Sequence, residues 1–491
     1  MTVLKPIMFV GTASDVGKSI INTGFCRIFK QDGFNPAPFK AQNMSLNSYA
    51  TPDGLEIGRA QAVQAEACGI DCHTDMNPVL LKPSSEKSSQ IVLNGKPAGN
   101  QSAYDYFMGN NKQELFKEVI AAYDRLSQKY NPVVMEGAGS ISELNLKHRD
   151  ITNMRMALYA NADTYLIADI DRGGVFASIY GTIALLPPEE KALIKGVIIN
   201  KFRGDSRLFE DGRKKIEELC GIPVVGVVPY LKGLDIEQED SVALQQKQFR
   251  QKEGKVNVVV VLLKRLSNYT DFSALERDDR VHLFYSHDPS EIAKADIIIL
   301  PGSKNTIADL IDIKNNGVAQ VIVSAFYQNR TVLGICGGYQ MMGLTVNDPL
   351  HVEGEIETMP GLGLLPVHTT LTAEKITRQC QFRYKARHEL CEGYEIHMGI
   401  SETEQNKPLT SSLSGQTDGY WLSDICWGSY IHGILDNKIV IDDILSRYLT
   451  QDHIVSDFID TKVYKEQQYD RLAQHLRTHI DIAYIYQQLQ S

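Results

Sequence analysis

One cysteine stands in the setting that a nucleophile requires. Cys336 belongs to the run Gly-Ile-Cys-Gly-Gly at residues 334–338, which follows an apolar stretch and precedes residues suited to a helix. The glycines permit a sharp turn between strand and helix, and the amino end of a helix favours the thiolate form of cysteine. The other seven of the eight cysteines lack this setting and are expected to be buried core residues. Cys336 is therefore the predicted nucleophile.

A cysteine nucleophile needs a base to activate it. Among the twelve histidines, His432 is the best candidate, because it stands at the end of a predicted strand in the sequence Trp-Gly-Ser-Tyr-Ile-His-Gly. His397 is the alternative, either as a rival base or as a substrate contact. The third member of the site stays open, since Asp436 lies further along the chain. The pattern thus predicts a Cys336–His432 dyad.

Backbone donors for an oxyanion are expected beside this dyad. A Pro-Gly-Ser turn follows the apolar stretch at residues 295–300, and it contains Gly302 and Ser303. Gly337, directly after the cysteine, is the third predicted donor. Such N–H groups stabilise the negative charge that develops on a carbonyl oxygen during acyl transfer.

A second chemical motif lies near the start of the chain. Residues 11–19 read Gly-Thr-Ala-Ser-Asp-Val-Gly-Lys-Ser between a predicted strand and a predicted helix, the context of a phosphate-binding loop. Lys18 can neutralise phosphates, and the Ser19 hydroxyl can bind Mg²⁺. Five residues, rather than four, separate the two glycines. The predicted nucleotide-binding residues are Gly11, Thr12, Asp15, Val16, Gly17, Lys18, Ser19 and, for the adenine base, Asn200.

Acidic residues are candidate metal ligands for the same loop. Glu136 ends an apolar stretch and is followed by Gly-Ala-Gly, the place where a second Mg²⁺ ligand is expected at the carboxyl end of a strand. Asp53 is a possible further ligand, although the interpretation as an exposed loop acid is favoured.

Two series of buried strands must position these groups. Short apolar runs at 6–10, 132–135, 164–170, 196–200 and 224–228 alternate with predicted helices such as 113–129 and 210–220. A polar stretch follows, and a new series begins with 256–263, 295–300, 331–335 and 428–431. The alternation predicts two three-layer α/β domains with parallel sheets. We expect domains at 1–235 and 252–450, a linker at 236–251 and a helical tail at 451–491.

Composition narrows the class of protein. The 491 residues carry a net charge of −10, and 43% are hydrophobic. The charge argues against a general nucleic-acid binder, although a local basic pocket remains compatible with an anionic ligand. Apolar runs are far shorter than the roughly 20 residues that span a bilayer. With no secretory leader pattern and scattered cysteines, we expect a cytoplasmic protein with reduced thiols and no membrane or nucleic-acid partner.

Each half resembles a known group of enzymes. The extended phosphate loop and the Glu-Gly-Ala-Gly strand end resemble the dethiobiotin-synthetase-like branch of P-loop proteins, which use ATP to activate a carboxylate. The second half is similar to class I glutamine amidotransferases, of flavodoxin-like fold, which release ammonia from glutamine. Most of that family carries a Glu two residues after the histidine, where this chain has Ile434. Together the two halves describe an amide-forming ligase.

The chain as a whole resembles the cobyric acid synthase family. Segments that carry the resemblance are residues 11–19, 39–48, 52–61, 76–83, 136–139, 169–174, 200–205, 267–272, 300–306, 334–338, 393–399 and 430–433. The resemblance implies amidation of the b, d, e and g carboxylates of adenosylcobyrinic acid a,c-diamide, a corrinoid, with ATP, Mg²⁺ and L-glutamine. Residues that would contact the corrinoid or phosphate are Lys40, Gln42, Asn43, Asp169 and Arg172.

Two other interpretations stay open. Cobyrinic acid a,c-diamide synthase shares both domain types, although residues 39–48 and 52–61 favour the first choice. An alternative of a different class is a nucleotide-switch ATPase scaffold in which the second domain only binds.

Overall fold

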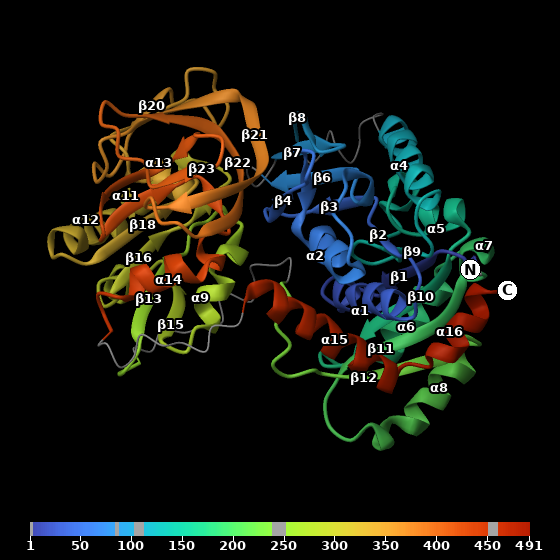
Figure 1. Ribbon diagram of the computed structural model, residues 1–491. Helices are drawn as coiled ribbons and strands as arrows, with labels where there is room; N and C mark the ends of the chain where they lie inside the picture. The colour runs from blue at the N-terminus through green and yellow to red at the C-terminus, as the bar shows by residue number, and fades with distance from the viewer. Residues whose placement is uncertain (1–2, 84–87, 103–111, 238–251, 450–459) are drawn as a thin grey trace.

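The computed structural model describes residues 3–83, 88–102, 112–237, 252–449 and 460–491. Two α/β bodies lie side by side, one built mainly from the first half of the chain and one from the second (Figure 1). The expected linker at 236–251 lies almost wholly outside the described residues, as does the start of the expected tail.

The first body is centred on a six-stranded parallel sheet of order β12-β11-β10-β1-β9-β2. Its strands are rich in β-branched and other apolar residues and buried on both faces, which confirms the strands expected from the sequence. They are β1 (Ile7–Gly11), β2 (Ala37–Phe39), β9 (Val133–Glu136), β10 (Asp163–Asp169), β11 (Ile194–Phe202) and β12 (Val224–Pro229).

Helices cover both faces of this sheet (Figure 1). They are α1 (Lys18–Gln31), α2 (Arg59–Cys68), α4 (Lys112–Ser127), α5 (Met154–Ala160), α6 (Val175–Ala184), α7 (Pro188–Lys191) and α8 (Glu210–Cys220). Between β2 and α4 the chain forms small strands that the sequence pattern did not indicate. These are β3 (Gln42–Met44), β4 (Ser48–Ala50), β5 (Glu56–Gly58), β6 (Val79–Pro83), β7 (Ser88–Leu93) and β8 (Lys96–Ser102).

The second body contains a sheet of order β15-β13-β16-β18-β26-β25, parallel except for β25. Its strands are β13 (Val256–Val261), β15 (Val281–Ser286), β16 (Ile297–Leu300), β18 (Thr331–Ile335), β25 (Tyr420–Ser423) and β26 (Cys426–Ser429). The helices are α9 (Ser273–Arg277), α10 (Pro289–Ile292), α11 (Thr306–Asn315), α12 (Val318–Tyr327), α13 (Gly337–Met342) and α14 (Lys438–Leu445).

A second, mostly antiparallel sheet packs beside it and was not expected. It contains β19 (Thr345–Asn347), β20 (Thr358–Pro360), β21 (His368–Tyr384), β22 (Leu390–Glu402), β23 (Thr410–Ser412), β24 (Thr417–Asp418) and β27 (Ile431–His432). A further short pair joins β14 (Leu266–Ser267) to β17 (Gly302–Ser303). The strand predicted at 428–431 is present as β26 beside β18, but its predicted end is wrong, because the chain passes after Ser429 to β27 in the antiparallel sheet.

The described part of the tail packs against the first body. Instead of one continuous helix it forms α15 (Thr461–His479) and α16 (Ile482–Leu489), separated where Ile480 pairs with Gly226 of β12. Helix α15 lies along α1 and β12, and the two termini are close together (Figure 1). The Lys5 N–H donates to the Leu489 carbonyl at 2.9 Å. The tail thus completes the first body's core.

Among the described residues, no helix combines the length and the apolar character that a membrane-spanning segment needs.

Candidate active sites

Cys336 lies at the tip of a strained turn between β18 and α13. Its backbone adopts φ 52° and ψ −110°, which is unfavourable for a residue with a side chain and is typical of functional turns. Neighbouring glycines make the turn possible: a Cβ on Gly338 would lie 2.0 Å from the Leu300 carbonyl oxygen, and one on Gly334 would lie 2.7 Å from the Tyr339 nitrogen. The predicted strand–turn–helix setting of the cysteine is therefore present.

His432 lies beside this thiol and is oriented by a carboxylate from elsewhere in the chain. The Cys336 thiol, which lies 3.7 Å from the Ile396 carbonyl oxygen, adjoins the imidazole closely enough to affect its pKa, and His432 Nδ1 lies 2.7 Å from Asp271 Oδ2. Asp271 also accepts the Gly433 N–H at 3.1 Å. Burial lowers the pKa of His432, but Asp271 and Cys336 outweigh it and raise the pKa to about 10. The three side chains form a Cys-His-Asp arrangement.

Asp271 is the member that the sequence pattern left open. It lies in residues 267–272, a segment that carried the family resemblance without an assigned role. Asp436 is half-buried and within electrostatic range of Asp271, but it is not hydrogen-bonded to His432 among the described contacts. The lack of an acid two residues after His432 was the signal that a carboxylate must come from another segment.

His397 lines the same pocket but has other partners. Its Nδ1 lies 2.8 Å from the Gly399 carbonyl oxygen, and its Nε2 lies 3.2 Å from Glu395 Oε2. Its ring stacks on that of Tyr430, with the centroids 3.8 Å apart. With both nitrogens engaged, His397 is better placed to shape the pocket than to act as the base.

The predicted oxyanion donors converge on the cysteine. A Cβ on Gly337 would lie 2.8 Å from the Ser303 nitrogen, and one on Gly302 would lie 3.4 Å from His432 Cε1. Of these residues, Ser303 and His432 line a cavity of about 460 Å³ together with Cys336. Its walls come from both bodies, since Ser48, Lys82, Ser88 and Gln90 line it together with the cysteine and histidine.

The phosphate loop forms a second site in the first body. Lys18 Nζ donates to the carbonyls of Ala13 and Gly139, each at 3.0 Å. Asp15 and Gly17 have φ values of 57° and 97°, as the curled loop requires. Asn200 braces the loop by donating to the Val16 carbonyl at 2.9 Å, so its expected contact with adenine stays a prediction.

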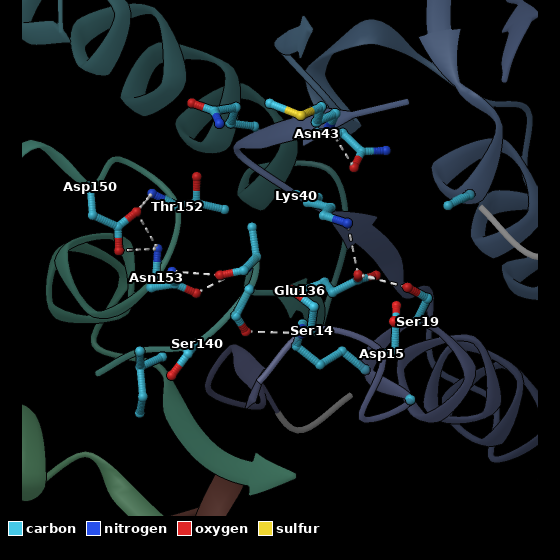
Figure 2. A pocket seen from close by; sticks show the side chains of 18 of the residues that line it. Ser14, Asp15, Ser19, Lys40, Asn43, Glu136, Ser140, Asp150, Thr152 and Asn153 are labelled. Atoms are coloured by element: carbon cyan, nitrogen blue, oxygen red, sulfur yellow. Dashed lines mark hydrogen bonds and ion pairs between the residues drawn. The ribbon is translucent and has the colours of Figure 1, made fainter. Parts of the chain in front are cut away.

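Glu136 lies at the centre of this site and points at the loop (Figure 2). Ser19 Oγ donates to Glu136 Oε1 at 2.8 Å, Lys40 Nζ lies 2.9 Å from the same oxygen, and Gln64 donates to Oε2 at 2.7 Å. Burial raises the pKa of Glu136, but Lys40 and the hydrogen bonds lower it below its ordinary value. The carboxylate is therefore ionised and adjoins a second hard oxygen donor, a pair suited to Mg²⁺.

The other expected residues divide into those that reach this pocket and those that do not. Lys40, Gln42, Asn43 and Arg172 line the cavity of about 670 Å³ that contains the loop. The structure also adds cations that the motifs did not indicate, namely Lys112, Lys147 and Arg149. Figure 2 shows Asp150, Thr152 and Asn153 closing the opposite wall.

Asp169 and Asp53 are not among the residues that line the pocket. Asp169 pairs with Lys201 at 3.0 Å, beneath the loop. Asp53 is exposed in the turn between β4 and β5 and accepts a hydrogen bond from Thr51. The β4–β5 hairpin carries Asp53 toward the second body, where a Cβ on Gly54 would lie 3.1 Å from the Thr377 carbonyl. The structure therefore does not bring Asp53 to Glu136.

Comparison with known proteins agrees with both domain types. Residues 7–244 match the family model of the CobQ/CobB/MinD/ParA nucleotide binding domain, and residues 257–440 match that of the CobB/CobQ-like glutamine amidotransferase domain. The fold and the two sites thus define the class: a nucleotide-binding domain joined to a glutamine amidotransferase domain, as in amide-forming ligases.

Full-length relatives narrow this class. The chain is 61% identical to cobyric acid synthase of Bacteroides fragilis, over 99% of this chain and 98% of that one. It is 59% identical to the Phocaeicola vulgatus enzyme of the same name (99% and 98%) and 45% identical to that of Syntrophobacter fumaroxidans (97% and 97%). The chain belongs to the cobyric acid synthase family.

Proposed function

We propose that this protein uses ATP and glutamine to amidate the b, d, e and g carboxylates of adenosylcobyrinic acid a,c-diamide, giving adenosylcobyric acid. The observation that carries the proposal is the presence, in one chain, of a Cys336–His432–Asp271 arrangement and a phosphate loop facing Glu136. The first supplies ammonia and the second activates a carboxylate.

In the second body, Cys336 would attack the carboxamide carbon of glutamine as a thiolate. The raised pKa of His432 keeps the imidazole protonated, so that it stabilises the thiolate and can give its proton to the leaving ammonia. Backbone N–H groups around Gly302, Ser303 and Gly337 would bind the oxyanion. Water then hydrolyses the thioester to glutamate and restores the thiol.

In the first body, the γ-phosphate of ATP would pass to a substrate carboxylate. Lys18 and the loop N–H groups hold the phosphates, and catalysis of this transfer rests mainly on positioning and charge stabilisation. Ammonia attacks the acyl phosphate, the amide forms and inorganic phosphate leaves. Ser19 and Glu136 are the residues that would hold Mg²⁺, which neutralises phosphate charge when bound.

Cationic side chains in the pocket support the binding of an anionic corrinoid, although the chain as a whole has a net charge of −10. Lys40, Lys112, Lys147, Arg149 and Arg172 all line the pocket of the phosphate loop. A substrate with several carboxylates would be attracted to this basic wall. The need for ATP supports a cytoplasmic location.

Mass spectrometry of the corrinoid product tests this proposal. With ATP and glutamine, adenosylcobyrinic acid a,c-diamide should be converted to the product amidated at b, d, e and g, each step lowering the mass slightly as NH₂ replaces OH. Cobyrinic acid is assayed alongside. Amidation of cobyrinic acid at a and c, with no reaction of the diamide, would contradict the proposal.

A further inference from the structure

The β4–β5 hairpin of the first body docks directly against the glutaminase site. The Ser48 N–H donates to Asn268 Oδ1 at 3.0 Å, and the Tyr269 N–H donates to Asn47 Oδ1 at 3.2 Å. Asn268 precedes, and Tyr269 begins, the short helical turn Tyr269–Phe272 that carries Asp271. The hairpin therefore contacts the segment that orients the base.

The same hairpin also contacts Tyr394, a residue that stacks on His432. The ring of Tyr394 stacks on the His432 imidazole, with the centroids 5.3 Å apart and the planes at 22°. Tyr394 also meets Tyr49 of β4, edge to face, with the centroids 4.6 Å apart. Tyr394 is 5% exposed, and its hydroxyl lies 3.4 Å from the Ser48 carbonyl oxygen. Stacked and edge-to-face aromatic pairs are both favourable beyond the surface area that they bury.

Tyr49 is in turn fixed from the side of the phosphate-loop pocket. The Arg59 guanidinium lies over the Tyr49 ring, 4.6 Å from its centroid, and the Arg59 N–H donates to the Asn47 carbonyl at 3.1 Å. Arg59 is ion-paired with Glu237, which lines the cavity of the phosphate loop. A continuous row of contacts thus runs from that cavity to the base in the other body.

We propose that Tyr49, a residue of the nucleotide-binding domain, is a positioning residue for the glutaminase reaction. It holds Tyr394 against the face of His432, and so keeps the imidazole aligned with both Asp271 and Cys336. This inference rests on the proposed function. Efficient hydrolysis of glutamine would then depend on Tyr49, a side chain that touches neither glutamine nor Cys336.

The test compares Tyr49→Ala with the full-length wild-type enzyme, with glutamine or ammonia as the nitrogen source. Loss of the Tyr49 ring should lower kcat for glutamine hydrolysis by about tenfold or more, because even a small displacement of a catalytic group such as His432 has a large effect on the rate. The KM for glutamine should change by less than about twofold, because Tyr49 does not line that cavity. Amidation with ammonia should be unchanged. Tyr49→Phe, which keeps the ring, should restore kcat.

A matched control removes a different contact of the same interface. Arg277 of α9 pairs with Asp235 of the first body at 3.4 Å, and among the described contacts Asp235 meets neither Tyr394 nor residues 267–272. Asp235→Asn should keep wild-type kcat. A rise in KM for Tyr49→Ala, the result expected if the domains merely separate and the wall formed by Ser48 and Lys82 is lost, would overturn the inference, as would an unchanged kcat. A wild-type enzyme inactive with both nitrogen sources would instead overturn the proposed function.

Discussion

The protonated state of His432, the base of the glutaminase site, depends on Asp271, which lies 161 positions earlier in the chain. Burial alone would favour a neutral imidazole at His432, and the Asp271 carboxylate reverses that preference. An imidazolium beside Cys336 is the partner that a reactive thiolate needs. Asp271 is thus as much a part of the proposed chemistry as the two residues that the motifs indicated.

Asp271→Asn should lower glutamine-dependent amidation by about 10²-fold or more, while amidation with ammonia is retained. Without the carboxylate, burial dominates and the pKa of His432 falls from about 10. The imidazolium then titrates at lower pH, so the alkaline limb of the pH profile of glutamine hydrolysis should move to lower pH. Steady-state rates measured from pH 6 to 10 check both points.

Asp436→Asn is the matched control for this substitution. Burial raises the pKa of Asp436 to about 7, so near neutral pH the carboxyl is already partly protonated, and it does not bond to His432. The variant should hydrolyse glutamine at close to the wild-type rate. Equal losses in the two variants would contradict the assignment of Asp271.

For individual residues, the sequence predicted the catalytic and binding side chains that belong to local motifs. Cys336 and Glu136 each stand at the end of an apolar strand, so neighbouring residues reveal their setting. Asp271 follows no such rule, because it becomes adjacent to His432 only when the chain folds. The structure supports the interpretation of Asp53 as an exposed loop acid, although nothing in its neighbours shows that the hairpin lies away from the phosphate loop.

Elements buried on both faces were predictable, and elements with one exposed face were not. Strands such as β13 and β18 are continuous apolar runs, which mark a parallel sheet. Strands β21 and β22 carry many exposed polar residues, and their pairing is set by contacts across the sheet. The site depends on them nonetheless, because Tyr394 and His397 lie on β22.

The tail is an element whose role appears only in the folded chain. Leu476 of α15 is fully buried and faces α1, where a Cβ on Gly24 would lie 2.3 Å from Leu476 Cδ1. Leu476→Ala should lower the free energy of unfolding by about 2–5 kcal/mol through lost burial and the cavity left behind. Urea unfolding measures the loss. Val463→Ala, on an exposed position of the same helix, should cost less than about 0.5 kcal/mol, and equal costs would contradict this role for the tail.

For the whole molecule, a buried ion cluster joins the two bodies. Glu56 of β5 pairs with Lys82 of the first body and with Lys375 of β21 in the second. Burial raises the pKa of Glu56, but the two lysines lower it far below its ordinary value of 4.5. This pairing contributes stability above pH 4.5 that is lost as the pH falls below that value.

A double-mutant cycle at this contact measures how strongly it couples the bodies. Lys375→Met leaves Glu56 buried with one cation instead of two, and should lower the free energy of unfolding at pH 7 by about 3 kcal/mol. The loss of stability in acid should be smaller in this variant than in the wild type. Combined with Glu56→Gln, the two effects should be non-additive by about 1 kcal/mol or more, and strict additivity would contradict an ion pair across the interface.

The central claim is that ammonia made at one site is consumed at the other, and the nitrogen source tests it most directly. Cys336→Ser should lower glutamine-supported amidation of the corrinoid by about 10³-fold or more, while ammonia-supported amidation continues at close to the wild-type rate. Lys18→Ala should lose amidation from both sources. Loss of both activities in Cys336→Ser, or persistence of ammonia-supported amidation in Lys18→Ala, would contradict the account.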